Sequence, residues 1–133
     1  MNRAILCSAI EGLASKYGYS FQLNDESYYP VTTSRYPAAF LVRPEFVKIE
    51  GRQHGRVTYK ISLILAQQGA KLSPQEQSDR FGEMENQMIQ LFVDLSQEPR
   101  VAVVDNLSIA TKNSVDTHGA IAVVGEAKVE TIF

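Results

Sequence analysis

The chain opens with the hydrophobic pattern of an amphipathic helix followed by a short strand. Apolar residues recur at steps of four, three and four, which places one stripe on a helix over residues 4–18: Leu6, Ile10, Leu13 and Tyr17. Gly18 is a typical helix stop. The alternation over residues 19–23 then predicts a strand, so we expect a helix that leads directly into a sheet.

The middle of the chain alternates like β-structure. Residues 38–43 and 45–50 predict two strands, which Pro44 interrupts because proline cannot donate to a strand ladder. Between them and the next strand, the segment GRQHGR (51–56) predicts a hairpin whose two glycines supply positive φ. Residues 56–67 predict a half-buried antiparallel strand with one apolar face: Val57, Tyr59, Ile61, Leu63 and Leu65.

Three residues predict the start of a long helix. Ser73 is a typical N-cap, Pro74 suits the first helical position, and Glu76 completes a capping box. The pattern predicts a helix over residues 74–96 with one apolar stripe: Phe81, Met84, Met88, Leu91, Phe92 and Leu95. We interpret its methionines as core residues rather than as a pliable partner groove.

Two closing strands complete the predicted fold. Residues 100–112 and 120–133 alternate around a turn, and Asp105 with Asn106 allows a bulge or break in the first of them. We therefore expect a single α+β domain over residues 1–133. One antiparallel or mixed β-sheet would carry the N-terminal helix and the long helix, in the order αβ(β)βαββ.

The segment 24–37 stands apart because it has two prolines and no apolar periodicity. Connections of this length inside a compact domain are often functional. It holds half of the six tyrosines of the chain: Tyr28, Tyr29 and Tyr36. Their rings either pack back on the domain or form an arm that docks on a neighbouring subunit, since tyrosine is favoured at interfaces.

Composition narrows the class of protein. The 133 residues are 44% hydrophobic and carry a formal net charge of −2, an ordinary globular balance that argues against general polyanion binding. The lone Cys7 cannot form an intrachain disulfide, and we interpret it as a small buried side chain rather than a nucleophile. The N-terminus is too polar for a signal peptide, and no run approaches the ~20 apolar residues of a membrane span. We expect a cytoplasmic protein without membrane contact.

Charge is distributed unevenly along the chain. Residues 43–60 contain five basic and two acidic residues, whereas residues 74–98 contain six acidic residues and one arginine. These segments are either solvated faces or the two halves of a head-to-tail contact that closes into a ring. The candidate interface residues are Arg52, His54, Arg56, Tyr28, Tyr29, Tyr36, Glu76, Asp79 and Glu83.

No familiar catalytic or cofactor motif occurs in the chain. Phosphate-binding, dinucleotide-binding, zinc-protease and nucleophile-elbow motifs are all missing, and one cysteine excludes paired-cysteine zinc modules. His54 and His118 lie in predicted turns without a partner at local spacing, while Glu83 and Glu85 point to different sides of their helix. We predict a protein that is not an enzyme and that has no catalytic residue, cofactor or metal.

The order and size of these elements resemble the tail-completion proteins of bacteriophages and prophages, which include tail terminators and minor tail or head–tail joining proteins. The resemblance is carried by 4-AILCSAIEGLASKYG-18, 46-FVKIEGRQHGRVTYKISLILAQQ-68, 81-FGEMENQMIQLFVDL-95 and the closing strands. It implies a subunit that assembles into a ring, often a hexamer, at the end of a tail tube. There it would stop tube growth and contact tail-tube or connector proteins, first in the host cytoplasm and then in the virion.

Two other functions are compatible with the residues. A small α+β nucleic-acid-binding module would use the basic hairpin over residues 52–60. A small-molecule or catalytic domain would need a pocket lined by His54, His118 or the loop tyrosines. The assembly role that the resemblance implies fits the missing catalytic set, the uneven charge and the tyrosine-rich connection, and we therefore place it first.

Overall fold

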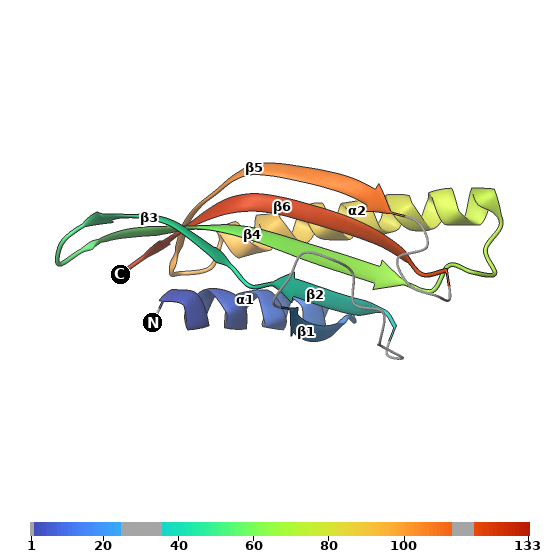
Figure 1. The fold of residues 1–133 in the computed structure, drawn as a ribbon, viewed down its shortest axis with the longest axis horizontal. Helices are drawn as coiled ribbons and strands as arrows, with labels where there is room; N and C mark the ends of the chain where they lie inside the picture. The colour runs from blue at the N-terminus through green and yellow to red at the C-terminus, as the bar shows by residue number, and fades with distance from the viewer. Residues whose placement is uncertain (1, 25–35, 113–118) are drawn as a thin grey trace.

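A computed structural model describes residues 2–24, 36–112 and 119–133. Within these ranges it contains two helices and six strands (Figure 1), namely α1 (Asn2–Lys16), β1 (Ser20–Asn24), β2 (Ala38–Val42), β3 (Glu45–Gly51), β4 (Gly55–Gln67), α2 (Pro74–Ser96), β5 (Val101–Lys112) and β6 (Ile121–Ile132). The α+β class is confirmed, and the order of elements matches the predicted αβ(β)βαββ except that four strands precede α2 instead of two or three. Among the described residues, no helix combines the length and the apolar character that crossing a membrane requires.

The strands form one sheet in the order β1-β2-β4-β6-β5, and β3 pairs with the remaining part of β4. The long central strand β4 thus pairs with β2 through residues 63–66 and with β3 through residues 55–60. Pro44 lies between these two partners, which confirms the predicted break. The pairing of β1 with β2 is parallel while all other pairs are antiparallel, so the sheet is mixed.

Both helices pack on one face of the sheet, where the main core lies. The predicted apolar face of β4 is buried there together with the stripes of α1 and α2. Met84 and Met88 have no exposed surface, which confirms their interpretation as core residues. The capping box of α2 is also present, since Ser73 Oγ accepts from the Glu76 amide at 3.2 Å and Glu76 Oε1 accepts from the Ser73 amide at 3.4 Å.

The other face of the sheet is more buried than the alternating pattern predicted. A second apolar cluster lies there, made of Ala38, Phe40, Ile64, Ala66 and Ala122. Ile64 and Ala66 belong to the face of β4 that we expected to be exposed, and their exposed fractions are only 2% and 1%. The prediction of a half-buried strand is therefore wrong for the second half of β4, where flanking strands β2 and β6 add small and aromatic side chains on the same side.

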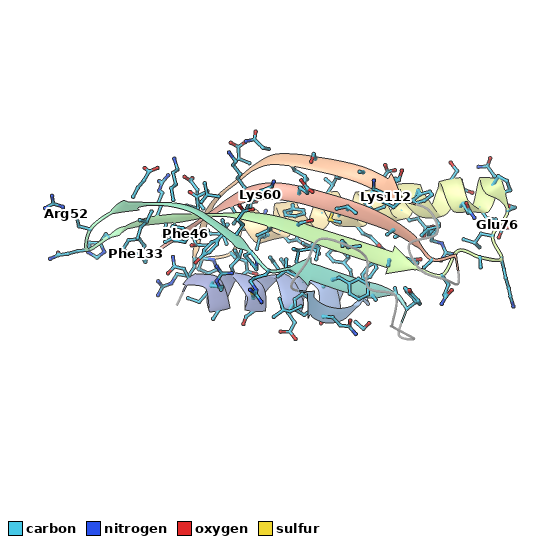
Figure 2. The ribbon with its side chains drawn as sticks, viewed as in Figure 1. Phe46, Arg52, Lys60, Glu76, Lys112 and Phe133 are labelled. Atoms are coloured by element: carbon cyan, nitrogen blue, oxygen red, sulfur yellow. The ribbon has the colours of Figure 1, made fainter. Side chains whose placement is uncertain are left out.

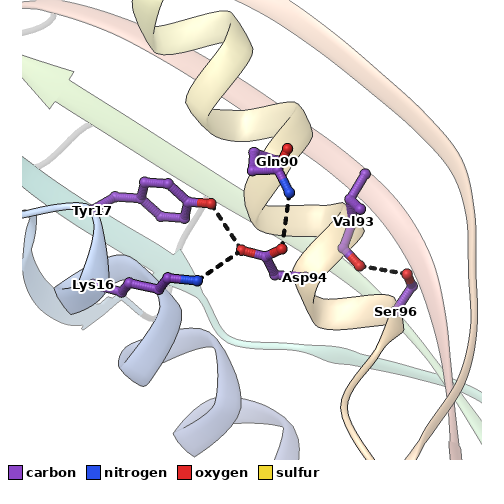
Figure 3. A network of polar contacts seen from close by, with 6 residues as sticks. All are labelled: Lys16, Tyr17, Gln90, Val93, Asp94 and Ser96. Atoms are coloured by element: carbon purple, nitrogen blue, oxygen red, sulfur yellow. Dashed lines mark hydrogen bonds and ion pairs between the residues drawn. The ribbon is translucent and has the colours of Figure 1, made fainter.

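Polar contacts join the two helices at Asp94 of α2 (Figure 3). Its carboxylate accepts hydrogen bonds from Gln90 Nε2 at 2.9 Å and from Tyr17 Oη at 2.8 Å, and Lys16 Nζ lies 3.5 Å away. These hydrogen bonds, first from Gln90 and then from Tyr17, lower the pKa of Asp94. The contacts tie the end of α1 to the last turns of α2, so the two helices form one layer.

Candidate interface at the two ends of the molecule

The β3–β4 hairpin extends beyond the rest of the molecule at one end of its long axis (Figure 1). Its strands remain paired up to Gly51 and Gly55, so residues 52–54 form a three-residue loop. Gly51 has φ +98°, as predicted for a tight reversal. Gly55 does not have positive φ, and the prediction for it is wrong. It is required by close approach, since a Cβ there would lie 2.0 Å from the Glu50 carbonyl oxygen and 2.9 Å from Phe133 Cζ.

The predicted basic residues of the hairpin are all exposed, but their surroundings differ. Arg56 lies 3.7 Å from Glu130, and Lys48 lies 2.7 Å from Glu50, so acidic neighbours already offset these two charges. Within the described part of the chain, Arg52 and His54 at the tip form no ion pair or side-chain hydrogen bond. The tip therefore presents one positive charge that no described residue of the same chain offsets.

Strand β3 adds an apolar feature that sequence reasoning missed. Phe46, Val47 and Ile49 are exposed by 51%, 44% and 58%, because β3 pairs only with β4 and no helix covers it. Phe46 contacts the ring of Tyr59 edge-on, with 5.9 Å between ring centroids. Alternation alone could not reveal this exposure, since the same pattern describes a strand with one buried face.

The predicted acidic residues lie at the N-terminal end of α2 and are all exposed: Glu76, Asp79 and Glu83. Asp79 accepts a hydrogen bond from Gln75 at 3.0 Å, and Glu83 lies 3.9 Å from Arg80. Figure 2 shows Arg52 and Glu76 at opposite ends of the long axis. The fold therefore separates the two predicted charged regions within one molecule, so they can meet only between two molecules.

The remaining candidate residues divide between packed and undescribed positions. Tyr36 is half-buried and packs against the second apolar cluster. Tyr28, Tyr29 and His118 lie outside the described residues. Cys7 is half-buried in α1, and burial raises the pKa of its thiol, as expected for a packed side chain rather than a nucleophile.

Two surface depressions are the alternatives to an interface as a candidate site. An open groove of about 670 Å³ lies along α1, and its lining includes Ala4, Ser8, Gly12 and also Glu98 from the connection that follows α2. A smaller depression of about 210 Å³ on the helix-free face of the sheet is lined in part by Lys48, Lys128, Asp105 and Glu130. Neither contains His54, and the described residues include no cluster of three or more potential metal ligands.

Comparison of the chain with models of protein families and with curated proteins found no match.

Proposed function

We propose that this protein is a structural subunit that assembles with copies of itself, head to tail, through the basic hairpin at one end and the acidic end of α2 at the other. The observation that carries the proposal is the separation of Arg52 and Glu76 to opposite ends of the long axis (Figure 2). Two different complementary surfaces on one molecule generate a heterologous contact, which repeats into a ring when the rotation closes.

The charges favour one relative orientation of the two molecules in this contact. Opposite charges steer encounters and oppose the hairpin-to-hairpin and helix-to-helix arrangements, in which like charges would meet. The exposed apolar residues of β3 support the proposal, because a neighbouring copy that covered them would remove apolar surface from water. The role that fits best is that of a phage tail-completion subunit, which would act without catalysis or a cofactor. Its further partners would be tail-tube or connector proteins, in the host cytoplasm and then in the virion.

The proposal is tested by reversing the charge of the hairpin. Arg52→Glu combined with Arg56→Glu should shift the protein toward monomer in multi-angle light scattering, while far-ultraviolet circular dichroism stays unchanged. Arg100→Glu reverses the charge of an exposed arginine that precedes β5, outside the hairpin, and should leave assembly intact. A wild-type protein that stays monomeric at low salt and high concentration would contradict the proposal.

A nucleic-acid-binding module is the alternative to be separated by the same variants. It predicts binding to duplex or single-stranded DNA that weakens steeply with salt and is lost in the hairpin variant. The acidic neighbours of Arg56 and Lys48 favour a protein partner over a polyanion, since Glu130 and Glu50 would lie against the phosphates. DNA binding by a monomeric wild-type protein would support the alternative.

A further inference from the structure

The end of the molecule that carries the acidic residues also contains an apolar recess. It has a volume of about 390 Å³ and is lined by the connection between β4 and α2: Gln68, Gly69, Ala70, Lys71 and Leu72. This connection leads directly into the first turn of α2 at Pro74, so the recess adjoins Glu76. Its volume lies at the lower end of the range for binding clefts, which gives room for a few side chains.

The recess is held in shape by the elements around it. The Gly69 carbonyl oxygen accepts hydrogen bonds from the Leu72 amide and from Gln77 Nε2 of α2, both at 3.2 Å. Gly69 itself is buried, and a Cβ there would lie 2.6 Å from Ile121 Cγ2 of β6. Because the loop is fixed to α2 and packed against the sheet, little conformational entropy would be lost when a partner binds.

The direction of the hairpin decides what this recess can receive. Within one molecule the hairpin points the same way as α2 runs from its N-terminus to its C-terminus (Figure 1). If the hairpin of a neighbour lay along the whole of α2 in that direction, Arg52 would pass the acidic residues and reach Ile89 and Val93. An arginine placed on two apolar side chains would lose hydration. A contact between the hairpin end of one molecule and the acidic end of the next avoids this cost.

We propose that the recess lined by residues 68–72 is the seat for the hairpin loop of the next copy of this chain. Residues 52–54 enter the recess, and Arg52 lies toward the exposed Glu76 and Asp79 in the first turns of α2. A narrow protruding loop and a preformed recess at opposite ends of one molecule thus become the two halves of a single repeated contact. This inference rests on the proposed self-assembly and adds the receiving surface to it.

Intermolecular disulfide formation tests this arrangement directly. In a Cys7→Ala background, Gln53→Cys is mixed with Ala70→Cys, since both positions are exposed. Mild oxidation should give a cross-linked dimer from the mixture. Gln53→Cys mixed with Val93→Cys is the matched control, because Val93 is also exposed, by 44%, but lies far along α2. It should give at least tenfold less cross-linked product.

Filling the recess provides a second, independent measurement. Ala70→Trp should raise the dissociation constant of self-assembly by about tenfold or more, whereas Asn86→Trp on the exposed side of α2 should leave it unchanged. If the wild type assembles but cross-linking and Ala70→Trp behave like their controls, the recess is not the seat, although self-assembly stands. If the wild type stays monomeric, the proposed function itself fails.

Discussion

Replacing Tyr19 by phenylalanine should destabilise the fold by removing one hydroxyl group. Tyr19 joins α1 to the sheet, and its side chain is 3% exposed. Its hydroxyl donates to Gln87 Oε1 of α2 and accepts from Gln67 Nε2 of β4 at 2.9 Å. Arg80 in turn donates to Gln67 Oε1 at 2.8 Å, so the hydroxyl lies at the centre of a network between α2 and the sheet.

The magnitude follows from the two hydrogen bonds that are lost. A typical intramolecular hydrogen bond contributes about 0.5–1.5 kcal/mol to stability, so Tyr19→Phe should cost about 1–3 kcal/mol. Because Gln67 and Gln87 are half-buried and water can partly replace the lost partner, we expect a value in the lower half of that range. The ring itself stays in place, so no cavity adds to the cost.

The matched control is Tyr59→Phe. Tyr59 is also buried, at 5% exposed, but its hydroxyl makes no hydrogen bond to any described residue. Its ring contacts to Phe46 and Arg3 are kept in the variant. Urea unfolding followed by circular dichroism at pH 7 should therefore show a lower midpoint for Tyr19→Phe and little change for Tyr59→Phe. Equal midpoints for the two variants would refute the reasoning.

The same hydroxyl predicts a dependence on pH. Burial raises the pKa of Tyr19 from its ordinary value of 10.0, so the folded state binds this proton more tightly than the unfolded state. The contribution of the protonated hydroxyl is complete below pH 10 and is lost as the pH rises through the folded-state pKa. The difference in stability between wild type and Tyr19→Phe should therefore shrink above pH 10, and a constant difference would contradict this assignment.

Two further predictions concern the contact between α2 and its neighbours. Gly125→Ala would place a Cβ 2.6 Å from Met88 Sδ. This overpacking should lower the free energy of unfolding, measured in urea, by about 1–3 kcal/mol. An unchanged midpoint would show that α2 moves away from the sheet at no cost. Asp94 has a pKa below its ordinary 3.8, so its contribution is present at neutral pH and is lost as the pH falls through the folded-state pKa. Acid titration of Asp94→Asn should show a shallower loss of stability below pH 4 than wild type, and identical acid curves would contradict the role of the Gln90 and Tyr17 hydrogen bonds.

Local signals predicted the long helix and the central strand well. Ser73, Pro74 and Glu76 each act within one turn, so the start of α2 could be read directly from adjacent residues. The alternation from Val57 to Leu65 likewise predicted which face of β4 is turned toward the helices, and that face is buried. These features depend on residues that are close together in the chain, so the local sequence is enough to predict them.

Features that depend on strand pairing could not be predicted in the same way. The parallel pairing of β1 with β2 joins residues on either side of the long connection 24–37, whose pattern has no periodicity. Ile49 is exposed because β3 has only one neighbouring strand. Ile64 is buried because β4 lies between two strands, β2 and β6, at that position. The order of strands in the sheet decides both exposures, and the hydrophobic pattern along one strand does not reveal that order.

The candidate interface shows the same division. The charges of Arg52 and Glu76 were visible in the sequence, and both side chains are exposed. Their placement at opposite ends of the molecule comes from the long β4 strand and the direction in which α2 returns along the sheet (Figure 2). The recess at residues 68–72 was not predicted, because a hydrophobic pattern does not show how the connection between β4 and α2 folds.

Self-association is tested most directly by the native mass of the wild-type protein across a series of salt concentrations. We predict species that are multiples of the 14.8 kDa chain at low salt, which dissociate toward the single chain as salt screens the contact between hairpin and helix. A mass of one chain at every concentration and every salt level would contradict the account.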